Sequence, residues 1–226
     1  MIHENLDPPQ VPEALASRIF IDFQPVRPLL PIRTRALIVI AIAVMAAAAL
    51  LASNGPRADL TTLPADMFAG MVMIRTILGV ALIGLALGEA VPAGGQTARW
   101  RSAWLTAGIG GLFVLPAGFA ALIGSRSHEA TPGPWFCFPF IIAVSVPSFI
   151  VVNLLLRRGY AFHPIRAGLI AGLGTGILAE AAQFAACANS AVGHQWLMHG
   201  GAVLSLAALG AIAGWFENRT RPYDSQ

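Results

Sequence analysis

The chain contains the stretch ALIVIAIAVMAAAALLAS at Ala36–Ser53, which carries no charged residue and runs into a polar turn. A helix of about twenty apolar residues is long enough to cross the hydrocarbon core of a bilayer. Five more stretches of this kind lie between short polar connections, at Met67–Gly88, Ala103–Gly124, Phe136–Leu156, Ala167–Ala188 and Gln195–Phe216. The sequence therefore predicts an all-α, polytopic membrane protein with six transmembrane helices.

Composition points to the same class of protein. Hydrophobic residues make up 56% of the chain and charged residues only 11%. A net charge of +3 could indicate nucleic-acid binding. The basic residues lie beside the predicted spans, however, so we interpret them as topology signals that contact anionic lipid headgroups. We expect the bilayer as a partner and no direct contact with nucleic acid.

The basic residues also predict the orientation. All fourteen are arginine. With the N-terminus in the cytoplasm, only Arg57 and Arg126 fall outside, and Arg75 falls within a span. The other eleven lie on cytoplasmic segments, at Arg18, Arg27, Arg33, Arg35, Arg99, Arg101, Arg157, Arg158, Arg166, Arg219 and Arg221. Positive residues are enriched in cytoplasmic loops, so this bias predicts an N-in, C-in topology.

Three regions follow from this topology: a cytoplasmic segment at residues 1–35, a transmembrane domain at 36–216 and a cytoplasmic tail at 217–226. Within the first region, apolar residues recur every fourth position and predict a short amphipathic helix. Such a helix could lie on the inner leaflet or enter the groove of a cytoplasmic partner. The second interpretation assigns partner binding to Leu15, Ile19, Phe20, Phe23 and Arg27.

The fifth and sixth spans carry small residues at regular intervals. Gly168, Gly172 and Gly176 are spaced four apart, and Gly200, Gly201, Gly210 and Gly214 lie in the sixth span. Small residues at this spacing allow the backbones of two helices to approach closely. We therefore expect these glycines to serve packing.

The two cysteines are predicted to lie at the same membrane surface. Cys137 begins the fourth span and Cys187 ends the fifth. The connection between these spans is short, so they should pack as antiparallel neighbours and bring the thiols to equal depth. Three interpretations remain open: independent buried cysteines, a structural disulfide, or a pair that responds to redox state or metal.

Histidines gather on the same predicted outer side. A set made of Cys137, Cys187, His194 and His199 could bind a metal ion transiently. The five-residue spacing of the two histidines does not fit one face of an α-helix, so the signal is weak. Histidines that donate hydrogen bonds to loop carbonyls are the alternative, and we expect no required cofactor.

Two charged residues are predicted within the membrane. Arg75 and Glu180 each lie eight residues from the outer end of their span, which is about 12 Å at 1.5 Å per residue. Unpaired charges at this depth are costly, so we expect the two side chains to form a buried ion pair. Its role could be purely structural, or it could lie on a polar stripe that leads through Gln183 to Cys187.

The pattern as a whole resembles the NrsF family of six-span bacterial membrane proteins. The matching segments are PVRPLLPIRTRA from Pro25, CFPF from Cys137, LLLRRGYAFHPIRAGLIAGLGTGILAE from Leu154, and HQWLMHGGAVLSLAALGAIAGW from His194. The resemblance implies an anti-sigma factor of the bacterial inner membrane. Its cytoplasmic segment would sequester an extracytoplasmic-function sigma factor. An envelope redox or metal signal at Cys137 and Cys187 would release that factor.

Other functions predict features that the sequence carries only in part. A small metal or solute transporter would use Arg75 and Glu180 to line a path, but we find no internal repeat of the kind common in transporters. An accessory subunit of a larger membrane complex would use the glycine stripes for contact. No arrangement of residues typical of an enzyme is present, so we expect a stress-responsive regulator of transcription.

Overall fold

The computed structural model describes residues 29–90, 98–124, 135–159 and 161–220. These residues form helices and no strand. The longer helices are α2 (Ile32–Asn54), α3 (Ala65–Gly88), α4 (Ala98–Ile123), α5 (Cys137–Arg158), α6 (Pro164–Ala186) and α8 (Gly201–Arg219). Short helical turns are η1 (Leu60–Thr62), α7 (Val192–His194) and η2 (Gln195–Gly200). Six helical segments are long and apolar enough to cross a membrane, so the prediction of an all-α, six-span protein is confirmed.

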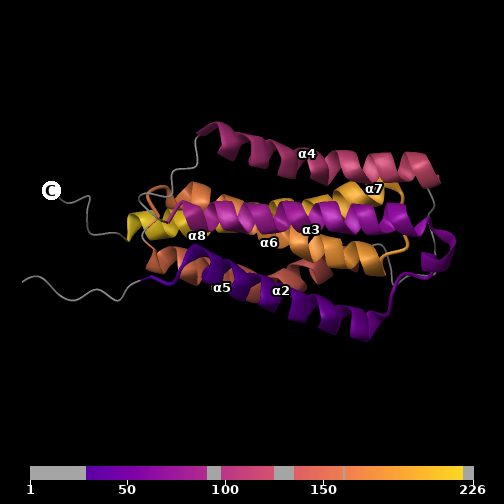
Figure 1. Ribbon diagram of the computed structural model, residues 1–226, viewed down its shortest axis with the longest axis horizontal. Helices are drawn as coiled ribbons and strands as arrows, with labels where there is room; N and C mark the ends of the chain where they lie inside the picture. Colours follow the sequence, from indigo (N-terminus) through magenta and orange to yellow (C-terminus); the bar gives the residue numbers. More distant parts are fainter. Residues whose placement is uncertain (1–28, 91–97, 125–134, 160, 221–226) are drawn as a thin grey trace, which may run out of the picture.

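The helices run up and down through one elongated bundle (Figure 1). Because the number of spans is even, α2 begins and α8 ends at the same end of the bundle, which we name the terminal end. The opposite end, where α5 begins and α6 ends, is named the cysteine end. Helix α6 lies in the middle and packs against α2, α3, α5 and α8, whereas α4 lies along one side.

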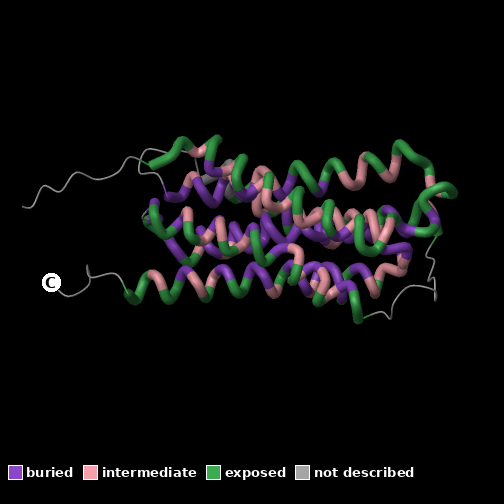
Figure 2. Tube along the Cα trace, turned by 90° about the horizontal axis from the view of Figure 1, so that it is seen from below, coloured by how far each residue is buried: buried purple, intermediate pink, exposed green. Residues whose placement is uncertain are grey.

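Burial differs strongly between the helices (Figure 2). In the most apolar 18-residue window of α6, 72% of residues are buried, against 11% in α2. Mean hydropathy is highest in α2 and lowest in α6. A helix that faces lipid needs apolar side chains all around, whereas a helix surrounded by protein can carry small and polar ones. Helix α6 is therefore the span that can carry functional polar side chains.

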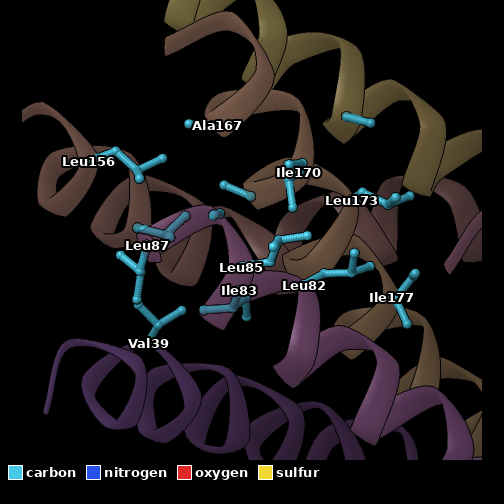
Figure 3. Packing of buried hydrophobic residues seen from close by; sticks show 14 of the residues in the cluster. Val39, Leu82, Ile83, Leu85, Leu87, Leu156, Ala167, Ile170, Leu173 and Ile177 are labelled. Atoms are coloured by element: carbon cyan, nitrogen blue, oxygen red, sulfur yellow. The ribbon is translucent and has the colours of Figure 1, made fainter. Parts of the chain in front are cut away.

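The main apolar core draws on all six long helices, and α3 and α6 supply most of its residues toward the terminal end (Figure 3). Leu82, Ile83 and Leu87 of α3 lie against Ile170 and Leu173 of α6 in this cluster. All five side chains are at most 1% exposed. Close packing of this kind gives α3 and α6 a fixed mutual position, on which the polar contacts at the cysteine end depend.

The predicted glycine stripe of α6 faces α8. A methyl group at Gly168 would overlap the carbonyl group of Gly210, and one at Gly172 would overlap the carbonyl group of Leu206. The backbones can approach this closely because Gly168 and Gly210 meet without side chains and Gly172 presents none to Leu206. Gly200 and Gly201 do not take part, because a methyl group there would meet only ordinary van der Waals neighbours.

Several boundaries differ from the predicted ones. Helix α2 begins at Ile32, directly after Pro31, and so takes in the last four residues of the predicted cytoplasmic segment. Helix α4 begins at Ala98 rather than at 103, and the last span begins at Val192. Charged residues mark the predicted span limits, but arginine side chains near helix ends can extend to the interface while the backbone stays helical. At the start of α2, for example, Arg33 is exposed.

Candidate functional site at the cysteine end

Two free thiols meet at the cysteine end. Cys137 is the first residue of α5, and Cys187 follows the last residue of α6, where its backbone N–H donates to the Gln183 carbonyl oxygen at 2.8 Å. Their Sγ atoms are 3.6 Å apart, and the two residues are only 6% and 4% exposed. Antiparallel packing of α5 and α6 thus brings together two cysteines that are fifty positions apart in the chain.

Polar side chains surround both sulfur atoms. Gln183 donates from Nε2 to Cys137 Sγ at 3.2 Å, and His194 Nε2 lies 3.5 Å from Cys187 Sγ. Met198 packs against the pair from the last span. The hydrogen bond with Cys137 and burial both raise the pKa of Cys187, which lies just beyond α6.

A π-helical turn sets the positions of the two histidines. Residues Gln195–Gly200 form this turn between α7 and α8. A π-helix has i→i+5 hydrogen bonds, so residues five apart lie near each other on its surface. The rings of His194 and His199 accordingly lie 5.4 Å apart, centroid to centroid. The spacing of an α-helix therefore does not predict that these two histidines lie together.

The π-helical turn completes a group of four possible metal ligands. One ligand atom each from Cys137, Cys187, His194 and His199 lies within 4.8 Å of all the others. Three of these residues are buried and His194 is half-buried. The sequence-predicted set is thus assembled in one place, from α5, the end of α6 and the start of the last span.

A chain of polar contacts leads from this group into the bundle. His199 Nδ1 lies 3.3 Å from Glu180 Oε1, while the other carboxylate oxygen, Oε2, lies 2.8 Å from Arg75 Nε. Arg75 also donates from Nη1 to the Met71 carbonyl oxygen at 3.3 Å, and its guanidinium lies over the Phe184 ring at 4.1 Å. The structure therefore brings Arg75 and Glu180 together as an ion pair.

The contact between Glu180 and His199 was missed. Sequence analysis placed His199 at the membrane surface, but both residues are at most 2% exposed. The available signal was position: a polar side chain inside the last span needs a partner, and a carboxylate on a neighbouring helix is a good one.

A second ion pair fastens the loop between α2 and α3 beside the cysteines. Arg57 Nε lies 2.6 Å from Asp59 Oδ1, and Nη2 lies 2.9 Å from Oδ2. The Arg57 guanidinium lies 5.3 Å from the Phe184 ring centroid, and its backbone N–H donates to the Ala185 carbonyl oxygen at 3.0 Å. From the sequence, Arg57 is predicted only as a topology signal, but the structure shows that this residue closes the carboxyl end of α6.

The terminal end carries its own charged contacts. Arg166 Nη2, on the first turns of α6, lies 2.5 Å from Glu89 Oε2, just after α3. Arg35 is 2% exposed and lies beside Gly159, which follows α5. Helix α6 therefore runs from the thiols at one end to an ion pair with the end of α3 at the other.

The predicted partner-binding residues lie outside the described part of the chain. These are Leu15, Ile19, Phe20, Phe23 and Arg27. His128 and Glu129, two further polar residues of the predicted outer side, also fall outside it.

Comparison with known proteins gives one match. No curated protein and no solved structure matches the chain. The model of the family NrsF, described as a negative regulator of sigma F, matches residues 21–219. This match takes in all six spans, both cysteines, both histidines and the Arg75–Glu180 pair. The chain is therefore a member of the NrsF family of negative regulators of a sigma factor.

Proposed function

We propose that this membrane protein is an anti-sigma factor of the bacterial inner membrane. It holds an extracytoplasmic-function sigma factor at the cytoplasmic face and releases it when an envelope redox or metal signal reaches Cys137 and Cys187. The family match supports the regulation of a sigma factor. The observation that carries the sensor assignment is the buried thiol pair with Sγ atoms 3.6 Å apart, flanked by two histidines.

Arginine placement supports the orientation. Arg33, Arg157 and Arg158 are exposed at the terminal end, where α2 begins and α5 ends. Cytoplasmic ends of spans are rich in arginine, so the terminal end would face the cytoplasm and the cysteine end the periplasm. The periplasm is the compartment in which thiol oxidation is common.

Helix α6 is the element that can transmit the signal. Its 23 residues span about 35 Å at 1.5 Å per residue, and the helix contacts all five of the other spans. Glycine contacts couple it closely to α8. A change in the position of Cys187 would therefore move α6 and α8 together, because packed interfaces shift between discrete arrangements rather than deform continuously.

Oxidation balances as follows. The two thiols lose two protons and two electrons to a peroxide, which is reduced to two waters, and one S–S bond forms. The sulfur atoms must then move from 3.6 Å to about 2.05 Å apart, which requires α5 and the end of α6 to shift. A change from 1% to 99% release needs about 5.5 kcal/mol of difference between states, which covalent or metal–thiolate bonding can supply.

The partner would be held at the terminal end. The segment before α2 carries the predicted apolar stripe, and α2 itself begins near the end of α5, where Arg35 lies beside Gly159. An amphipathic helix with an apolar stripe is a common ligand for a groove in a partner protein. Rearrangement of the bundle at this end would change how the segment is presented.

Capture of the sigma factor tests the first part of the proposal. The protein in lipid nanodiscs should capture its extracytoplasmic-function sigma factor, and a variant without residues 1–23 should not. A variant without residues 221–226 is the matched control and should bind normally. Equal capture by all three proteins would remove the leading segment from the mechanism.

Replacement of the thiols tests the second part. The double variant Cys137→Ser, Cys187→Ser should insert into the membrane and capture the sigma factor, but it should not release it after peroxide treatment. Release from the double variant at the rate of the native protein would overturn the sensor assignment.

Labelling of intact cells with a thiol reagent that cannot cross the inner membrane should modify the native protein only, which tests the orientation.

A further inference from the structure

We infer that Cys137, Cys187, His194 and His199 form a closed tetrahedral centre for a divalent d¹⁰ cation of the zinc class, and that Glu180 orients His199 within it. This inference rests on the proposed function, because it names the ligand and the regulation of the same thiol site. It goes beyond that function by assigning a bound cation of the zinc class and an orienting role to the Glu180 carboxylate behind His199.

The spacing of the ligand atoms fits such a centre. With Zn–S bonds of about 2.3 Å and Zn–N bonds of about 2.0 Å, a tetrahedron has S···S edges of about 3.8 Å and S···N edges of about 3.5 Å. The Sγ atoms of Cys137 and Cys187 are 3.6 Å apart, and Cys187 Sγ is 3.5 Å from His194 Nε2. Only small movements of side chains would bring all four atoms into bonding range.

One ring nitrogen of His199 is buried without a hydrogen-bond partner, which indicates a ligand. His199 Nδ1 faces the Glu180 carboxylate, while Nε2 is buried and makes no hydrogen bond. A buried polar atom without a partner is costly, so its persistence calls for an occupant. In metal centres, a histidine that binds through one nitrogen commonly donates its other N–H to a carboxylate, which fixes the tautomer. The pair of Glu180 and His199 has this arrangement.

The summed charge of the four ligands favours a divalent cation. Two thiolates carry a charge of −2, and neutral histidines add none, so a divalent cation leaves the centre neutral. Glu180 behind the centre is already balanced by Arg75 at 2.8 Å. A monovalent cation would leave a net negative charge among residues that are almost fully buried, which is unfavourable. Ligands of two sulfurs and two imidazoles in tetrahedral geometry are typical of zinc.

Metal binding and oxidation exclude each other at this site. Both sulfurs bind the cation as thiolates, after their protons pass to water. Disulfide formation would require the same two sulfurs to give up the metal and approach to about 2.05 Å. The centre would therefore be either metal-bound or oxidised. The metal must leave before the disulfide can form, and the disulfide must be reduced before the metal can bind.

The experiment measures metal on the purified full-length protein, reduced and reconstituted in nanodiscs. Zinc content and competition with a chromophoric chelator give stoichiometry and affinity, and Co²⁺ serves as a spectroscopic probe of tetrahedral thiolate ligation. We expect one zinc ion per native chain. His194→Ala and His199→Ala should each abolish stoichiometric binding, and Glu180→Gln should weaken affinity about 10–100-fold. His163→Ala, at the exposed start of α6, is the matched control and should bind as the native protein does.

Because His194 is only half-buried, His194→Ala still tests the inference if a substitution at a buried position prevents folding. Absence of stoichiometric zinc in the native protein, unchanged affinity in His194→Ala, or equal loss in His163→Ala would each overturn the inference. None of these measurements involves a sigma factor. If zinc does not bind but peroxide still releases the sigma factor through the two cysteines, the metal centre is refuted and the proposed function stands.

Discussion

Removal of Glu180 offers a quantitative test of the polar chain in the membrane. Glu180 and Arg75 have side chains that are 2% and 4% exposed, and they lie 2.8 Å apart. Glu180→Gln leaves the Arg75 guanidinium with the Met71 carbonyl oxygen at 3.3 Å and the Phe184 ring at 4.1 Å, while its Nη2 already has no partner.

The expected loss follows from these contacts. Breaking a buried ion pair by removing one partner costs about 3–5 kcal/mol. The Phe184 ring can stabilise a desolvated cation by about 2 kcal/mol, so we expect the lower end of the range, about 3 kcal/mol. That is a large part of a typical unfolding free energy of about 5–15 kcal/mol. Arg75→Gln should cost a similar amount, because it leaves the carboxylate with His199 alone.

The double variant isolates the interaction energy of Arg75 with Glu180 from the effects of the two single substitutions. Arg75→Gln combined with Glu180→Gln restores neutrality, so it should be no less stable than either single variant, with a coupling energy of about 3 kcal/mol. Unfolding by SDS in mixed micelles, followed by far-ultraviolet circular dichroism, measures all four proteins. Chelator must be present, because bound zinc would stabilise the proteins that retain Glu180 more than those that lack it. Losses that add within about 0.5 kcal/mol would refute the ion pair.

Two further predictions concern packing and thiol chemistry. Gly172→Ala should lower the unfolding free energy by about 1–3 kcal/mol, because the added methyl group overlaps the Leu206 carbonyl and separates α6 from α8. Gly84→Ala in α3, which would meet nothing within 4 Å, is the control and should be neutral or stabilising; equal losses would contradict the assigned crossing. Zinc at 100 times its dissociation constant should slow peroxide-driven joining of Cys137 to Cys187 about 100-fold by mass action, as measured by mass spectrometry of the intact chain. An unchanged oxidation rate would show that metal and oxidant act at different places.

Much of the fold could be predicted because the bilayer imposes strict requirements. Apolar stretches of the necessary length stand out against short polar loops, and the spans follow from them. The same reasoning led to the proximity of Arg75 and Glu180, since two isolated charges at equal depth need each other. The depth of the two cysteines followed from the short connection between α5 and α6.

The remaining features depend on local geometry that composition does not reveal. The π-helical turn changes which residues share a face, so the link from His194 to His199 could not follow from α-helical periodicity. Arg57 folds back onto Asp59 and the Phe184 ring, although a loop arginine is ordinarily read as solvent-facing. The helix ends also differ from the predicted ones. The positions of arginines show where charged side chains lie, and the backbone can stay helical beyond them.

The central claim is that the state of the thiols at one end of the bundle controls sigma-factor binding at the other. The most direct measurement is the dissociation constant of the sigma factor for the full-length protein in nanodiscs, before and after peroxide oxidation, with the double serine variant alongside. The account predicts at least about tenfold weaker binding after oxidation of the native protein, which is 1.4 kcal/mol of coupling, and no change in the variant. The same dissociation constant before and after complete disulfide formation would contradict it.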